Sequence, residues 1–241
     1  MSGVSVRRVR AIVGKELREY TRNYSIVAAM TIIPLIFLLQ PVVIVLKLPP
    51  SAAGVFAHTH VLLYLLAVPA LAPATVAAYA VVGERLQGTL EPILTTPIRR
   101  QEFLLGKALA ALMPSVAVAY AVYAAFLAVV GLFAERAVTS ALLHWPDLVA
   151  QVLFTPLLAL WSIWIGIGIS ARVRDVRVAQ QLGLLAGLPA AAVTSLVAFG
   201  TIPATAGLAF ACAAVLLLLD GLGWRILSAT LDPERLITGG R

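Results

Sequence analysis

Charged residues are scarce in this chain. They make up 12% of its 241 residues, whereas hydrophobic residues make up 61%, and the mean hydropathy is +0.98. About a quarter of the residues in a typical soluble domain are charged, and this much apolar surface could not be covered without a lipid solvent. The composition therefore excludes a soluble domain and predicts a polytopic membrane protein.

Cysteine and histidine are scarce as well. The single cysteine, Cys212, excludes a disulfide framework and a thiolate metal cluster. His58 and His60 are two residues apart, so they would not share a helix face, and no acidic or thiol partner is nearby. The sequence therefore predicts no metal site, and it contains no assembled set of catalytic acid and base.

A phosphate-binding loop is also missing. Gly83 and Gly88 have the glycine spacing of that motif, but Thr89 stands where its lysine is needed to hold phosphates. We therefore expect the chain not to hydrolyse ATP and to bind no cofactor of its own.

Long apolar runs are what the chain does have. A helix needs about 20 apolar residues to cross a bilayer, and six runs are long enough. These runs cover residues 25–46, 59–82, 108–133, 148–171, 180–199 and 204–224. Residues 1–241 are thus predicted to form one all-α transmembrane domain, with only the short turn 200–203 between the last two spans. Gly183 and Gly187 in the fifth run permit close helix approach and are a candidate oligomer contact.

The basic residues orient these spans. If the N-terminus is cytoplasmic, every one of the 18 basic residues except Lys47 and Arg136 lies in a cytoplasmic segment, as the positive-inside rule requires. The net charge of +7 thus follows topology and anionic lipid and does not indicate nucleic acid. We expect a multi-pass protein of the plasma membrane with both termini in the cytoplasm. Asp220, near the cytoplasmic end of the sixth run, is a candidate partner for Arg225.

The N-terminal segment has the pattern of an amphipathic helix. Its apolar residues recur at spacings of three and four, while most of its basic residues lie off that stripe. The stripe consists of Val6, Val9, Val13, Leu17 and Tyr20. We predict a helix over residues 4–22 that lies in the cytoplasmic membrane interface, in contact with lipid, and turns into the first span.

The most informative segment is the polar stretch 84–107 between the second and third spans. Glu84 and Arg85 end the second span, Gly88 loosens the helix, and Thr89 is a plausible N-cap for a new short one.

Leu90, Ile93 and Leu94 then share one face of the new helix, and Glu91 lies in its first turn, where the helix dipole favours an anion. Pro97 ends this helix. An exposed leucine face at the mouth of the bundle needs a partner.

The residues of this loop resemble those of the type-2 ATP-binding-cassette (ABC) transporter permeases. The shared pattern is Glu84-Arg85-x-x-Gly88-Thr89-Leu90-Glu91-x-x-Leu94-x-x-Pro97-x-Arg99-Arg100-x-Glu102-x-x-x-Gly106-Lys107. The family plan is similar in size, with an interfacial N-terminal helix and six spans. One departure is the very short connection between spans five and six, where many members have a longer re-entrant segment.

The resemblance implies that residues 84–107 form a cytoplasmic coupling loop that docks on a separate ABC ATPase subunit. Leu90, Glu91 and Leu94 would make the docking contact, and Glu84, Arg85 and Gly88 would shape the approach. The same pattern includes Thr89, Pro97, Arg99 and Arg100 in the expected ATPase-binding segment. ATP and magnesium would be bound by the ATPase, and the permease would pair with an identical or related copy.

The sequence thus predicts the permease subunit of an ABC exporter. One alternative is an ion-coupled secondary transporter, although spans one to five have no charged residue at their centres for coupling. A second alternative, within the ABC class, is a haem-exporter-type permease, whose loop is similar. A membrane-embedded enzyme is a further alternative, but it would need a catalytic set that the sequence lacks.

Overall fold

The computed structural model of the chain describes residues 4–47, 59–88 and 98–230. Within these ranges the protein is helical and contains no strand. Its helices are α1 Val6–Arg22, α2 Tyr24–Lys47, α4 Val61–Tyr64, α5 Ala67–Ala77, α6 Tyr79–Leu86, α8 Arg100–Phe133, α9 Arg136–Leu142, α10 Trp145–Ser170, α11 Val176–Ala198 and α12 Ala206–Thr230.

Six of these helical segments are long and apolar enough to cross a membrane, with α4, α5 and α6 together forming the second. The prediction of an all-α, six-span membrane protein is confirmed. The third span begins at Arg100 and not at residue 108, because the backbone N–H of Arg99 donates to the Glu102 carboxylate (3.0 Å) and caps the helix within the polar segment. The sixth span continues to Thr230.

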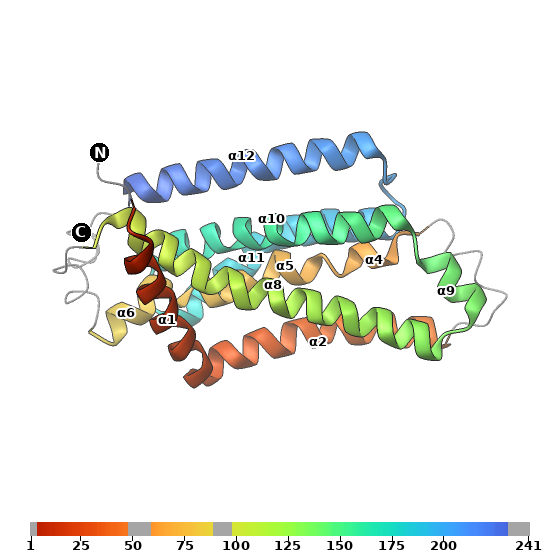
Figure 1. The fold of residues 1–241 in the computed structure, drawn as a ribbon, viewed down its shortest axis with the longest axis horizontal. Coiled ribbons are helices and arrows are strands. Elements are labelled where there is room, and N and C mark those ends of the chain that lie inside the picture. Colours follow the sequence, from red (N-terminus) through yellow and green to blue (C-terminus); the bar gives the residue numbers. More distant parts are fainter. Residues whose placement is uncertain (1–3, 48–58, 89–97, 231–241) are drawn as a thin grey trace.

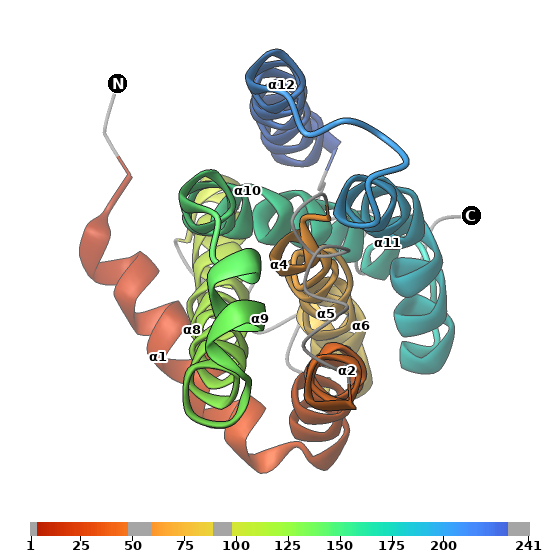
Figure 2. The same cartoon turned by 90° about the vertical axis from the view of Figure 1, so that its right-hand side faces the viewer.

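The second span forms the centre of the bundle. In the view along the spans, α5 is surrounded by α2, α8, α10 and α11, whereas α12 stands at the periphery (Figure 2). The most apolar stretch of the second span is 89% buried, and that of α12 is 11% buried. The core is therefore built around the second span, and much of the sixth span is left for lipid or another subunit.

Glycines allow the neighbouring helices to approach α5 closely. A Cβ atom on Gly166 of α10 would lie 2.7 Å from the Ala74 carbonyl oxygen, and one on Gly187 of α11 would lie 2.6 Å from that of Ala70. Gly183, the other glycine of the predicted oligomer contact, also faces Ala74. The two glycines thus pack against α5 within the chain, and the interpretation as an oligomer contact is wrong.

Two serine hydroxyls of α10 bond to the backbone of the second span, and one of them does so at the interruption between α5 and α6. The Ser162 hydroxyl accepts a hydrogen bond from the Ala74 N–H (3.0 Å). The Ser170 hydroxyl accepts from the N–H groups of Val81 and Val82, each at 3.0 Å, and donates to the Ala78 carbonyl (2.6 Å). In a membrane helix, Ser side chains of a neighbouring helix can satisfy backbone groups that an interruption frees, so the second and fourth spans are joined by polar contacts in an apolar interior.

Helix α1 lies across one end of the bundle, the end at which α12 also leads to the C-terminus (Figure 1). The C-terminal part of its apolar stripe is covered by protein, because Tyr20 is buried in the same cluster as Leu104 of α8, and Val13 and Leu17 pack against that cluster, whereas Val6 at its start is exposed. The predicted amphipathic helix forms, with its apolar face against α8.

Asp220 of α12 is only 7% exposed, and neither of its carboxylate oxygens has a hydrogen-bond partner in the described part of the chain. The predicted pairing with Arg225 does not form there, because residues five apart point to different sides of a helix.

The outer histidines are not isolated, contrary to the sequence interpretation. His60 Nδ1 lies 2.8 Å from Asp147 Oδ1, and His144 lies on the other side of the same carboxylate, its Nδ1 3.7 Å from Oδ2. Asp147 was overlooked because it is far from His58 and His60 in the sequence and is brought to His60 only by the packing of α10 beside α4.

Candidate functional site

The predicted coupling loop begins where α6 ends. Gly88 has a φ of +68°, a left-handed conformation that glycine adopts without strain. The N–H groups of Gln87 and Gly88 donate to the carbonyls of Gly83 (3.0 Å) and Arg85 (3.2 Å) and close the last turn. The chain therefore leaves the helix at the glycine that the sequence identified.

Glu84 is buried at this helix end, with 2% of its surface exposed. Its Oε1 accepts hydrogen bonds from the Nζ atoms of Lys107 and Lys15, each at 2.6 Å. Lys107 also donates to Glu16 Oε1 at 2.6 Å. The four side chains, which we call the ionic cluster (Lys15, Glu16, Glu84 and Lys107), join α1, α6 and α8.

The ionic cluster is neutral and mostly removed from water. Glu16 and Lys107 are each 2% exposed, like Glu84, whereas the Lys15 side chain is 38% exposed and also pairs with Glu19 at 3.2 Å. Burial raises the pKa of Glu16, and the neighbouring Lys107 opposes that shift. Because two carboxylates face two ammonium groups, the charges can stay buried as long as all four are present.

A second group of contacts fixes the start of α1 to the start of α8. Glu102 Oε1 accepts from the Ser5 N–H (2.8 Å) and forms an ion pair with Arg8 (3.0 Å), and the Glu102 side chain is fully buried. One turn further on, the α8 backbone comes so close to α1 that a Cβ on Gly106 would lie 2.6 Å from Ile12 Cγ2. Helix α1 is therefore held against α8 at several points along its length.

Arg85 ties the same region to the next connection. Its Nη1 donates to the Val173 carbonyl (3.0 Å) in the segment between α10 and α11. Asp175 in that segment caps α11 by accepting from the N–H groups of Arg177 (2.6 Å) and Val178 (3.3 Å). Both flanks of residues 89–97 are thus anchored, one to α1 and α10–α11, the other to α1.

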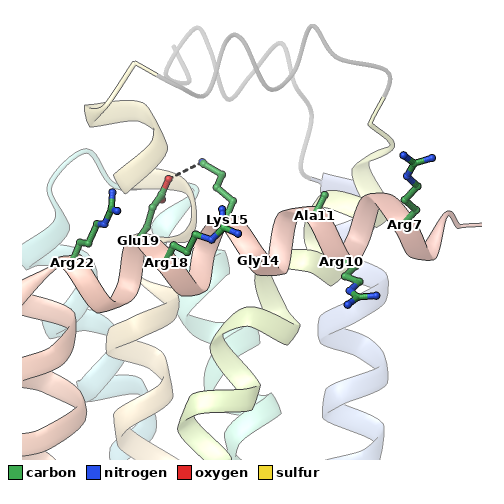
Figure 3. Close-up of a pocket in the computed structure, with 8 residues that line it drawn as sticks. All are labelled: Arg7, Arg10, Ala11, Gly14, Lys15, Arg18, Glu19 and Arg22. Carbon is green, nitrogen blue, oxygen red and sulfur yellow. Dashed lines mark ion pairs between the residues drawn. The ribbon is translucent and has the colours of Figure 1, made fainter.

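An open pocket runs along α1 beside this site, lined by Arg7, Arg10, Ala11, Gly14, Lys15, Arg18, Glu19 and Arg22. Figure 3 shows Lys15 directed to Glu19, and Arg7 and Arg10 pointing to opposite sides of the helix. Because these two guanidinium groups diverge, the pocket has a basic surface without a converged anion site.

The predicted site residues fall into two groups. Glu84, Arg85, Gly88, Arg99 and Arg100 are described and lie at the two ends of the segment, with Arg99 as the N-cap of α8. The others lie outside the described residues. They are Thr89, Leu90, Glu91, Leu94 and Pro97.

Sequence reasoning missed most of the ionic cluster. Lys15 was placed only among the basic residues of the cytoplasmic side, Lys107 was placed there and at the end of the family pattern without an ion-pair partner, and Glu16 was not considered. One signal was present: Glu16 lies three residues after Val13 and four before Tyr20, so it is a charged residue on the apolar stripe of α1. Such a residue needs a buried cation, and Lys107 is that cation.

Comparison with known protein families gives a match over most of the chain. The model of a family described as "ABC-2 family transporter protein" matches residues 10–222, which include all six spans except the end of the last, most of α1 and the whole of the predicted coupling loop. No curated protein matches the chain.

Proposed function

Because the chain belongs to the ABC-2 family of transporter proteins, we propose that it is the permease subunit of an ATP-driven exporter. In this proposal ATP is hydrolysed by a separate ABC ATPase, which docks on residues 84–107. The observation that carries the proposal is the anchoring of both flanks of this segment by the ionic cluster and by Glu102. A docking loop can move the spans only if its two ends are held firmly by them.

In this proposal the site lies in the cytoplasm. The predicted cytoplasmic segments contain all basic residues except Lys47 and Arg136, and α1 lies at the end of the bundle where α12 also ends (Figure 1). In the plasma membrane of a cell this orientation would bring the loop to the compartment that contains ATP.

ATP and magnesium would be bound by the partner ATPase and not by this chain. When two ATPase subunits close around nucleotide, the motion would reach the permease through Leu90, Glu91 and Leu94, as the family resemblance implies. Glu84 and Lys107 would pass it to α6 and α8, and the buried cluster would make α1 move with them.

Two permease copies would form the complete pathway. The sixth span is exposed over most of its length, and its outward side chains include Phe210, Val215, Leu218 and Leu222. A two-fold pair of identical chains is the usual arrangement of oligomers, and a related chain could take the second place. Lipid would cover the apolar surface that the pair leaves open.

Changing the charge at two positions of the loop tests this proposal. We expect Glu91→Arg and Leu94→Asp to abolish co-purification with the partner ABC ATPase and to stop ATP-dependent uptake of substrate into inside-out vesicles, while the six spans still insert. Glu135→Arg, the matched charge reversal just before α9 at the other end of the bundle, should leave both readouts unchanged.

Two results would contradict the proposal. One is unchanged co-purification and export in both loop variants. The other is transport that continues after ATP depletion but collapses with a proton uncoupler, which would favour an ion-coupled transporter.

A further inference from the structure

A cluster of metal-binding side chains lies at the end of the bundle opposite α1. His60 directly precedes α4, His144 is the N-cap residue of α10, and Asp147 lies in the first turn of α10. One ligand atom from each of the three lies within 4.8 Å of the others. The cluster joins the starts of the second and fourth spans and is far from the predicted coupling loop (Figure 1).

The carboxylate at the centre of this cluster is buried and only half satisfied. Asp147 is 2% exposed, and its Oδ1 lies 2.8 Å from His60 Nδ1. Its Oδ2 has no hydrogen-bond partner in the described part of the chain, and neither has His144 Nδ1, which lies 3.7 Å from it. That distance is too long for a hydrogen bond, so an acceptor and a ring nitrogen face each other across an unfilled gap.

The backbone holds the three residues in place independently of these side-chain contacts. The His60 N–H donates to the Ala198 carbonyl at the end of α11 (2.9 Å). The N–H groups of His144 and Asp147 donate to the carbonyls of Leu142 and His144, each at 3.0 Å. The two imidazoles lie with their ring centres 5.7 Å apart. The arrangement is therefore built by three helices and is not an accident of mobile side chains.

We propose that His60, His144 and Asp147 bind a divalent transition metal, with zinc as the ion that fits best. Zinc bonds imidazole nitrogen and carboxylate oxygen at about 2.0–2.2 Å, which puts tetrahedral ligands roughly 3.3 Å apart. The distance from His60 Nδ1 to Asp147 Oδ1 is 2.8 Å, and that from His144 Nδ1 to Asp147 Oδ2 is 3.7 Å, so the two distances lie on either side of that value. Two imidazole ligands favour zinc over magnesium or calcium, which prefer oxygen.

The ion would satisfy both unpartnered atoms at once. Three protein ligands leave a fourth position for water, and the histidine rings, 27% and 31% exposed, provide access from solvent. The bound ion would join the second span to the fourth at the end where the chain otherwise links them by the His60–Asp147 contact. This inference is independent of the proposed export function.

The other acidic group of the described residues makes a useful contrast. Glu16, Glu19 and Glu84 also come close enough to share an ion, but Lys15 and Lys107 already occupy that space. A cation would have to displace two ammonium groups there, whereas at Asp147 it would displace none.

Zinc binding to the purified full-length protein in detergent tests the proposal. Competition with a chromogenic chelator should show one zinc ion per chain. We expect His60→Ala, His144→Ala and Asp147→Asn each to weaken binding at least about tenfold, while each variant elutes as wild type on size exclusion. His58→Ala, which changes the nearest other histidine in the sequence, should bind as wild type.

A variant that replaces one metal ligand by another separates loss of a ligand from misfolding. His144→Cys should still bind the metal, and with cobalt it should gain the ultraviolet charge-transfer band of a metal thiolate. Wild-type zinc binding no stronger than that of the double variant His60→Ala/His144→Ala would overturn the proposal, leaving a His–Asp hydrogen bond only. A missing thiolate band, or an equal loss in His58→Ala, would overturn the ligand assignment.

Discussion

The two ends of the bundle each bury a carboxylate and neutralise it in different ways. At the α1 end, Glu84 is paired with the amines of Lys107 and Lys15. At the opposite end, Asp147 faces His60 and His144, whose ring nitrogens can hold either a proton or a metal ion. At the first end the protein itself neutralises the carboxylate. At the second end, in our proposal, a zinc ion from solution does so. The ionic cluster therefore suits a region that transmits motion, whereas the site at Asp147 suits a region that responds to the metal content of the solution.

Removing the buried lysine should have the largest effect on this comparison. Lys107→Met would leave Glu16 and Glu84 as buried carboxylates without their shared cation, and loss of one partner in a buried pair costs about 3–5 kcal/mol. We expect a correspondingly large drop in the melting temperature in detergent. Lys15→Met is the matched control, because it removes a bond of the same 2.6 Å length to the same Glu84 oxygen from a side chain that is 38% exposed. The control should cost at most about 1 kcal/mol, and equal losses would show that burial does not decide the strength of the cluster.

The next largest loss of stability is expected from a steric clash introduced between α1 and α8. In Gly106→Val, the new side chain would meet Ile12 at 2.6 Å, and overpacking of this kind costs about 1–3 kcal/mol. We expect lower thermal stability and faster trypsin cleavage within α1. Gly131→Val, near the opposite end of the same helix, meets nothing within 4 Å and should be close to neutral. Similar behaviour of both variants would argue against the tight docking of α1.

The far-end carboxylate should tolerate change better. Asp147→Asn keeps the shape but weakens the bond to His60, and in chelator-treated protein we expect a loss of about 1 kcal/mol in stability. Asp175→Asn is the control, because asparagine caps a helix as well as aspartate does. A loss as large as that of Lys107→Met would mean that the two ends are equally rigid.

The smallest effect concerns pH. Burial alone would lower the pKa of Lys15, but the hydrogen bond and charge of Glu84 outweigh it and raise the pKa above its usual range. A pKa raised by folding gives stability that is present below the unfolded value of about 10.4 and is lost as pH rises through the folded value. The difference in melting temperature between wild type and Lys15→Met should therefore be constant from about pH 7 to 9 and shrink above about pH 10. A difference that already disappears below pH 9 would contradict the raised pKa.

The sequence predicts the architecture better than the contacts that stabilise it. Apolar runs of about 20 residues identify spans because a lipid solvent imposes that length, and Gly88 ends α6 where its conformational freedom indicated. Which residues meet between spans depends on packing that no local pattern records. Asp147 could not be assigned to His60 from spacing alone, and Glu84 was expected to end a span at the surface when it is buried among lysines. Glu16 on an apolar stripe was the only local sign of that arrangement.

Ser170 has a consequence for how force would travel through the protein. Its hydroxyl holds Val81, Val82 and Ala78 at once, so α6 is fastened to α10 at the point where it departs from α5. In the proposed coupling, this short helix would therefore turn about Ala78. A displacement applied at Gly88 would move the C-terminal end of α10 together with α6. Helix α5, which is surrounded by other helices, would stay in place.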